Sequence, residues 1–141
     1  MLKSLYAAGA AAAAFCLLAV PAAAIAQYRH AIDNDLDRCH GGEGPAVRIT
    51  VSGIKASRGT IRVQSYRATR ADWLTKGRWI NRIELPARAG SMVFCMPLPA
   101  SGSYAIAVRH DINGNGDTDI TQDGGGMSNN PSINVFNLGR P

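Results

Sequence analysis

Six Asp and Asn side chains fall between residues 111 and 123 of this 141-residue chain, and their types and spacing are those of a calcium-binding loop. Five occupy alternate positions around Gly116 and the sixth ends the loop: Asp111, Asn113, Asn115, Asp117, Asp119 and Asp123. Ca²⁺ prefers about six to eight oxygen ligands, alternate residues of such a loop point inward, and the glycine permits the sharp turn. We predict that these residues bind Ca²⁺ as a structural cofactor.

The loop departs from an EF-hand at its closing position. The twelfth residue, where an EF-hand carries a bidentate Glu, is Gln122, and Asp123 stands one place later. The loop also follows a predicted strand and runs into the glycines at 124–126, so no helix pair flanks it and an EF-hand is excluded. Two interpretations stay open: a calcium loop on a β scaffold, or Asn-Gly and Gly-Asp turns that merely connect strands.

The first 26 residues have the pattern of a signal peptide. Lys3 supplies the positive start, residues 5–20 are uncharged and rich in alanine, and residues 24–26 place small side chains at the cleavage site. At about 16 residues the apolar stretch is shorter than the roughly 20 that span a bilayer. We therefore predict a periplasmic or secreted protein, cut after Ala26, that is not an integral membrane protein after cleavage.

Export determines how the cysteines are interpreted. Cys16 leaves with the signal peptide, so Cys39 and Cys95 remain as one pair. In an oxidising compartment such a pair predicts a disulfide. A metal site built from Cys39, His40 and His110 is the alternative, but it lacks the paired ligand spacing of structural zinc sites.

The charge of the chain raises the question of an anionic partner. The sequence carries 15 Lys and Arg against 10 Asp and Glu, a net charge of +5. Arg48, Arg62 and Arg82 occupy polar positions of predicted strands, and adjoining strands would place them on one face suited to anionic envelope polysaccharide, lipid headgroups or an acidic protein. An ordinary solvated face is the alternative. We expect no nucleic-acid partner, because the chain is exported and carries no recognised nucleic-acid motif.

The elements that position these residues are predicted to be strands. Residues 27–45 form a polar arm, and residues 46–141 form one domain in which apolar and polar residues alternate with the period of half-buried strands. The predicted strands are residues 47–52, 61–65, 79–85, 91–98, 103–110 and 133–138. Residues 68–76, anchored by Trp73 and Leu74, form the only helix-like stretch. The pattern predicts an all-β fold, an antiparallel β-sandwich of about six or seven strands.

The segment around the loop resembles a family of small secreted bacterial proteins known only as a domain of unknown function. The family pattern is G-x-Y-A-[IVL]-x-x-x-H-D-x-N-x-N-x-x-x-D, followed by G-[FM]-S-N-N. The matching residues are Gly102, Tyr104, Ala105, His110, Asp111, Asn113, Asn115, Asp119, Gly126, Met127, Ser128, Asn129 and Asn130. The resemblance extends more loosely over residues 47–141. It implies a transthyretin-like or immunoglobulin-like sandwich in the periplasm or outside the cell, with no assigned reaction.

One end of the family pattern differs in this chain. Members of the family continue past a Gly-x-Pro that resembles residues 139–141 into a closing strand. The resemblance therefore implies that residues 133–138 take over that role, or that one sheet edge stays open to pairing with another chain.

The sequence assigns no catalytic residue. It lacks G-x-S-x-G, H-E-x-x-H and the terminal Tyr-Arg-Gly-Ser of transthyretin-like hydroxyisourate hydrolases. A small periplasmic hydrolase on that scaffold would use His40 or His110 with Arg109, but we expect His110 to end a strand and brace the loop. We predict a non-enzymatic binding or structural module of the cell envelope, whose partner the sequence does not identify.

Overall fold

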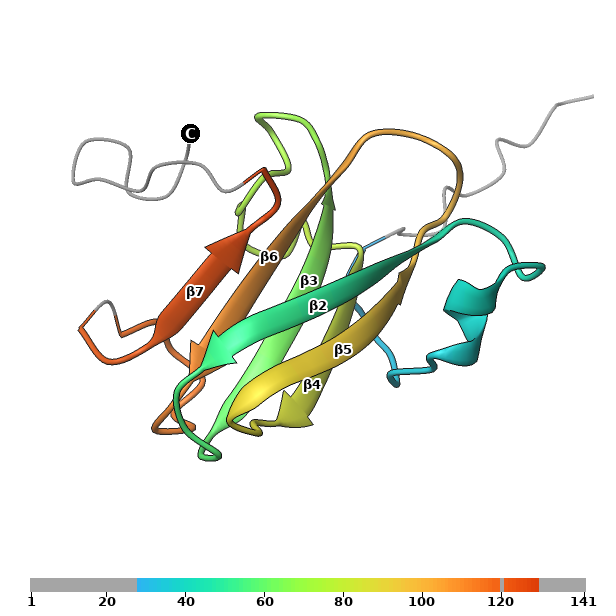
Figure 1. The fold of residues 1–141 in the computed structure, drawn as a ribbon. Helices are drawn as coiled ribbons and strands as arrows, with labels where there is room; N and C mark the ends of the chain where they lie inside the picture. The colour runs from blue at the N-terminus through green and yellow to red at the C-terminus, as the bar shows by residue number, and fades with distance from the viewer. Residues whose placement is uncertain (1–27, 120, 130–141) are drawn as a thin grey trace, which may run out of the picture.

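The computed structural model describes residues 28–119 and 121–129, which form seven strands and one short 3₁₀-helix (Figure 1). The elements are β1 (His30–Ala31), η1 (Asp37–His40), β2 (Ala46–Ile54), β3 (Thr60–Arg67), β4 (Asn81–Pro86), β5 (Gly90–Pro97), β6 (Tyr104–Asp111) and β7 (Gly124–Met127). The predicted all-β sandwich is confirmed. The predicted signal peptide and the strand predicted at 133–138 lie outside the described residues. No helix in the described part of the chain is long and apolar enough to cross a membrane.

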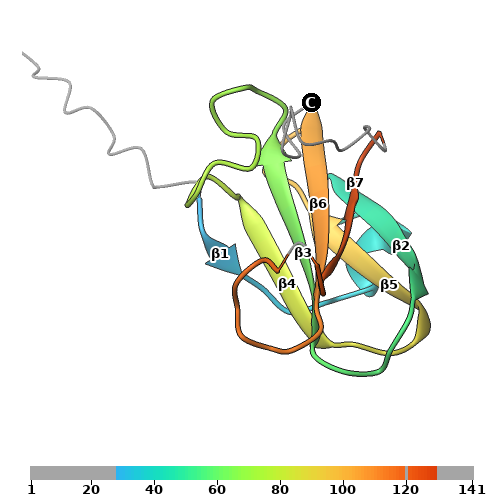
Figure 2. The same ribbon diagram turned by 90° about the vertical axis from the view of Figure 1, so that its left-hand side faces the viewer.

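The strands form two layers of unequal width. The larger sheet has the order β1-β4-β3-β6-β7, and the smaller sheet pairs β2 with β5. Neighbouring strands are antiparallel except β1 and β4, which run parallel. Figure 2 shows the two-stranded layer on one side of the five-stranded layer. A narrow layer therefore covers only part of a wide one.

The alternation in the sequence sets which side chains enter the space between the layers. On β3, Ile61 and Val63 are fully buried, while Arg62 between them lies on the outer face. On β2, Val47, Ile49 and Val51 are half-buried, Ile54 is buried and Arg48 is exposed. The fully enclosed core consists of Ile54, Ile61, Val63, Ile83, Ala87, Phe94 and Met96, which come mainly from β3, β4 and β5.

The N-terminal arm packs beside the core on the β4 and β5 side. β1 pairs with β4, and the side chain of Asn34 bridges to β5 by donating to the Val93 carbonyl (2.9 Å) and accepting from the Cys95 N–H (2.9 Å). The Cys39–Cys95 disulfide follows, with the two Cα atoms 5.8 Å apart. The arm thus contains a strand that the sequence did not predict, and it is tied to β5 by the predicted disulfide.

The segment predicted to be helix-like forms consecutive turns instead. Thr69 begins them, because its hydroxyl and carbonyl accept the N–H groups of Asp72 (3.2 Å) and Trp73 (2.9 Å). Leu74 then adopts a positive φ of 51°, which a right-handed helix does not permit. The Trp73 ring still anchors the segment, with its centroid 5.4 Å from that of Tyr66 in an edge-to-face arrangement.

Candidate functional site

The loop that connects β6 to β7 begins at a buried carboxylate. Asp111 is the last residue of β6 and is 2% exposed. Its two carboxylate oxygens accept the N–H groups of Gly114 (2.7 Å) and Gly116 (2.8 Å). Both glycines have positive φ, 73° and 83°, which lets the chain wrap around the carboxylate. Gly59 packs so closely on this strand end that a Cβ there would lie 1.8 Å from the Asp111 carbonyl oxygen.

The environment of Asp111 favours its charged form. Burial by itself raises the pKa of this carboxyl group. The opposite effect is larger in sum, because the carboxylate accepts the N–H groups of Gly116 and Gly114 and lies near the Arg109 guanidinium. The net pKa therefore lies below the ordinary value. Asp111 is therefore an anion at neutral pH, buried at the root of the loop.

Three further side chains of the predicted set meet at one oxygen atom. The side-chain amide nitrogens of Asn113 and Asn115 lie 2.7 and 2.9 Å from Oδ2 of Asp119, to which they donate. The amide oxygen of Asn113 accepts the N–H of Asn115 (3.1 Å), and that of Asn115 accepts the N–H of Asp117 (2.8 Å). The exposed Asp117 carboxylate makes no hydrogen bond or ion pair with the described chain, so it stands apart from this group.

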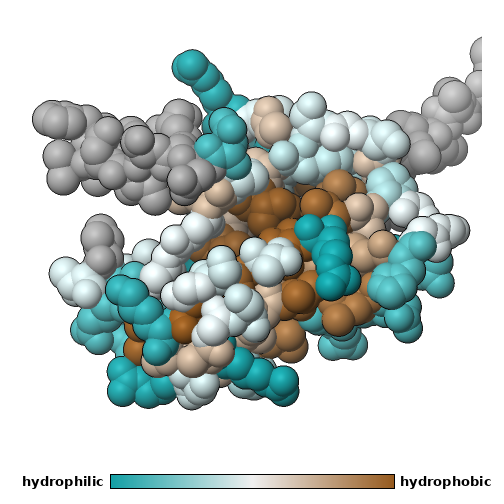
Figure 3. All heavy atoms as spheres, in the orientation of Figure 1, coloured by the Kyte–Doolittle hydropathy of each residue, from teal (hydrophilic) through white to brown (hydrophobic). Residues whose placement is uncertain are grey.

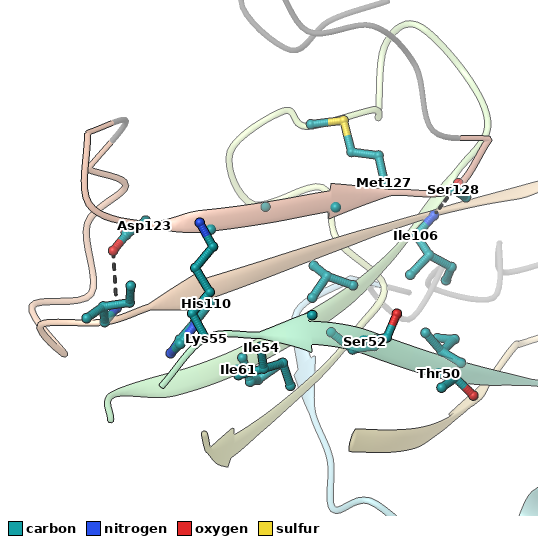
Figure 4. Close-up of a pocket in the computed structure, with 18 of the residues that line it drawn as sticks. Thr50, Ser52, Ile54, Lys55, Ile61, Ile106, His110, Asp123, Met127 and Ser128 are labelled. Carbon is teal, nitrogen blue, oxygen red and sulfur yellow. Dashed lines mark hydrogen bonds between the residues drawn. The ribbon is translucent and has the colours of Figure 1, made fainter. Parts of the chain in front are cut away.

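Asp123 closes the loop. Its carboxylate accepts the N–H groups of Ile112 (3.2 Å) and Asp119 (3.0 Å), and Figure 4 marks the first of these bonds. The Asp111, Asp119 and Asp123 carboxylates thus face N–H donors of the loop. Within residues 28–119 and 121–129 no group of three or more His, Cys, Asp or Glu side chains is arranged to hold a metal ion. The structure brings five of the six predicted residues into one hydrogen-bonded loop.

Arg109 secures this loop to the sheet, a role that the sequence analysis did not assign. Its guanidinium donates to the Thr118 hydroxyl and the Gly116 carbonyl, both at 2.8 Å, and lies 3.5 Å from the Asp111 carboxylate. The sequence could have indicated this contact, because side chains alternate along a strand and residues 109 and 111 therefore face the same side.

His110 points to the opposite side of β6, between the layers, and is 7% exposed. Its Nε2 donates to the Arg58 carbonyl (2.8 Å), so the imidazole braces the turn before β3 and not the 111–123 loop. His40 is exposed in η1, and the disulfide occupies Cys39. The alternative metal site that joins Cys39 and His40 to His110 is therefore wrong.

The three predicted anion-binding arginines do not share a face. Arg62 and Arg82 lie on the outer face of the larger sheet, where Arg62 forms an ion pair with Glu84. The Arg82 guanidinium lies 4.1 Å from the centroid of the Trp79 ring, and burial together with the neighbouring Arg62 lowers its pKa. Arg48 belongs to β2 in the other sheet. Only the first two therefore adjoin, and register places Arg109 directly opposite Arg62.

A groove of about 630 Å³ opens between β2 and β7, at the side of the sandwich where the described residues of the smaller sheet do not cover the larger one. Its apolar lining comes from β2, β3 and β6: Ile49, Val51, Ile54, Ile61, Ile106 and Val108. The glycines of β7, a strand that the sequence did not predict, form the opposite wall. Figure 3 shows the apolar atoms of this region exposed between paler atoms of the two layers.

Comparison with known proteins gives one match. The family model described as "Uncharacterized protein conserved in bacteria (DUF2141)" matches residues 49–141. No curated protein and no solved structure matches the chain. The match agrees with the predicted resemblance to a bacterial family of unknown function.

Proposed function

We propose that this chain, which belongs to the DUF2141 family of uncharacterized bacterial proteins, is a non-enzymatic binding or structural module of the cell envelope. In this proposal its 111–123 loop binds Ca²⁺. The observation that carries this proposal is that the Asn113 and Asn115 amides both contact one carboxylate oxygen of Asp119, in the loop that begins at the buried Asp111 anion.

Binding of the cation requires a small rearrangement of the loop. The two amides now direct nitrogen atoms to Asp119. A half-turn of each amide group would direct its oxygen there instead and would release the N–H groups of Asn115 and Asp117. A carboxylate accepts up to about four interactions, so Asp111 and Asp123 would keep their N–H partners while they ligate Ca²⁺. Extracellular calcium modules bind with dissociation constants of about 10⁻⁴–10⁻³ M, which suits a loop that lacks the bidentate Glu.

Two features support a location outside the cytoplasm. The Cys39–Cys95 disulfide is consistent with an extracytoplasmic protein, because such bonds persist in oxidising compartments. The pattern of residues 1–26 adds the expectation of a cleaved signal peptide and a periplasmic or secreted product.

The position of His110 favours binding over catalysis. Its Nε2 is engaged with the Arg58 carbonyl, and no described carboxylate makes a hydrogen bond or ion pair that would orient the ring as a general base. The small hydrolase that the sequence leaves open thus gains no support from this side chain.

A second candidate partner is an anionic envelope polysaccharide bound at Arg62 and Arg82. Their adjacency on the outer face of the larger sheet favours it. We expect salt-sensitive retention on heparin that Arg82→Gln reduces and Arg48→Gln, on the other sheet, does not. Equal retention of both variants would contradict this partner.

Calorimetric titration with Ca²⁺ tests the main proposal. We expect one site with a dissociation constant of about 10⁻⁴–10⁻³ M and weaker binding of Mg²⁺. Asp119→Asn should weaken Ca²⁺ binding at least about tenfold, because it removes a ligating charge at the point of convergence. Asp33→Asn makes the same charge change in the arm and should leave the affinity unchanged. Equal affinities in the two variants would refute the loop as the site.

A further inference from the structure

The groove between β2 and β7 is bounded by two strands with only one partner each. Within the described chain β2 pairs only with β5, and β7 pairs only with β6. Ile106 and Val108, which would be enclosed beneath a wider second layer, remain half-buried and line the groove. The volume of about 630 Å³ lies within the roughly 300–1,000 Å³ typical of small-molecule sites.

The glycine strand leaves one wall of the groove without side chains. None of Gly124, Gly125 and Gly126 has a positive φ, and a Cβ on each would meet nothing closer than 3.5 Å. The described backbone therefore does not require glycine at these positions. Gly126 pairs with the inward Val108, so its missing side chain leaves space in the groove, whereas Gly125 pairs with the outward Arg109.

A cation and a carboxylate both line one end of the groove, and the cation has no ion-pair partner among the described residues. Lys55 lines this end together with His110 and Asp123 (Figure 4). The Asp123 carboxylate is occupied by N–H groups of the loop, and Lys55 forms no ion pair with any residue that the structure describes. Of the other labelled polar side chains, Ser52 lies between the two ends, and Thr50 and Ser128 lie at the far end.

We propose that this groove binds a single-chain anionic amphiphile, with the alkyl chain along the apolar lining and the head group at Lys55. From Ile49 to Lys55 the floor runs for roughly 20 Å, which is long enough to hold the extended chain of a medium-chain fatty acid. The isoleucine and valine side chains along this length favour an alkyl chain, and Lys55, which has no described ion-pair partner, favours an anionic head at one end. The groove adjoins the calcium loop at Asp123, but its test does not depend on Ca²⁺ binding.

Titration of the oxidised protein with laurate, below its micelle concentration, tests this site. Dodecyl phosphate replaces the carboxylate head by a phosphate, and dodecyltrimethylammonium reverses the charge on the same chain. We expect saturable one-to-one binding of the two anions and at least tenfold weaker binding of the cation. Decanoate should bind more weakly than laurate by about fourfold for each methylene removed.

Two glycine variants on one strand supply the matched control. Gly126→Phe fills the groove and should abolish laurate binding, whereas Gly125→Phe places the same ring on the outer face and should leave the affinity within about twofold. Lys55→Gln should weaken both anions about three- to fivefold, as expected for an exposed ion pair. Laurate-induced amide shifts in the unmodified protein, confined to β2, β6 and β7, would support the site independently of any variant.

Three results would overturn the proposal. Equal laurate affinity in Gly126→Phe and Gly125→Phe would place binding elsewhere. Equal affinity for laurate and dodecyltrimethylammonium would remove the role of Lys55. Absence of amphiphile binding, with self-association that Gly126→Phe abolishes, would assign the groove to a second copy of the chain.

Discussion

Between β4 and β5 the two layers are sealed except at a smaller pocket of about 360 Å³ beside Leu85 and Met92, whereas between β2 and β7 they stand apart over the groove. The sealed side holds Ile83, Phe94 and Met96, none of which is exposed. The open side holds Ile106 and Val108, which have the same chemical character and the same alternation but stay half-buried.

The N-terminal arm accounts for much of this difference. It pairs with β4 through β1, reaches β5 through Asn34 and is fixed there by the Cys39–Cys95 disulfide. On the sealed side Asn81 also joins the layers, donating to the Pro97 carbonyl at 2.7 Å. A two-stranded layer cannot cover five strands, so the arm completes one side, and the candidate sites lie at the other.

Removal of the disulfide should have the largest effect, because it releases the arm from the sealed side. The bond joins residues 56 apart, for which the loop-entropy model gives a loss of about 4 kcal/mol in the free energy of unfolding. Urea unfolding of Cys39→Ser/Cys95→Ser against the oxidised protein measures this loss. A loss below about 1 kcal/mol would mean that the arm holds without the bond.

Truncation of one isoleucine on each side tests the difference in burial directly. Ile83→Ala leaves a cavity in an enclosed core and should cost about 4 kcal/mol, whereas Ile106→Ala should cost about 2 kcal/mol or less because solvent already reaches the groove. The free energies of unfolding in urea provide the comparison. Equal costs would show that the open side is sealed in solution.

The loop at the open side depends on Asp111. Asp111→Asn keeps one oxygen acceptor but turns an amide nitrogen toward the N–H of Gly114 or Gly116, so it should cost about 2 kcal/mol. Asp117→Asn makes the same change at a carboxylate with no described partner, and should alter stability by less than about 0.5 kcal/mol. Thermal unfolding in EDTA separates this effect from metal binding, and similar losses in both variants would contradict the assignment.

The lowered pKa of Asp111 predicts a modest dependence of stability on acid. An unfolded Asp titrates near pH 3.9, as a rough value, and the folded carboxyl titrates lower, so the unfolded chain binds more protons. The contribution of Asp111 is therefore complete above about pH 4 and is lost as the pH falls through the folded pKa. In acid titrations monitored by urea unfolding, the unmodified protein should lose stability more steeply below about pH 4 than Asp111→Asn does. Parallel curves would contradict this prediction.

The sequence predicted those strands whose side chains alternate. Residues such as Val47 and Ile49, or Ile61 and Val63, mark β2 and β3 because one face of each strand must be apolar. β1 and β7 were missed for a physical reason. A two-residue strand shows no period, and consecutive glycines have no side chains to alternate. These two strands form only because β4 and β6 offer them a sheet edge with which to pair.

The loop was predictable in part because its spacing is local. Alternate positions place Asp111, Asn113 and Asn115 on one side of a turning chain whatever surrounds it. The groove depends instead on how strands distant in sequence are layered, which also separates Arg48 from Arg62. Sequence spacing alone does not contain that information.

Thermal unfolding of the oxidised protein in EDTA and then in about 10 mM CaCl₂ tests the calcium proposal most directly, with MgCl₂ as the control. With a dissociation constant of about 10⁻⁴–10⁻³ M, Ca²⁺ should stabilise the fold by about 1.4–2.7 kcal/mol and raise the midpoint by at least about 5 °C. Asp119→Asn should lose this rise and Asp33→Asn should retain it. A midpoint that is the same in EDTA, CaCl₂ and MgCl₂ would show that the loop is only a connection between strands.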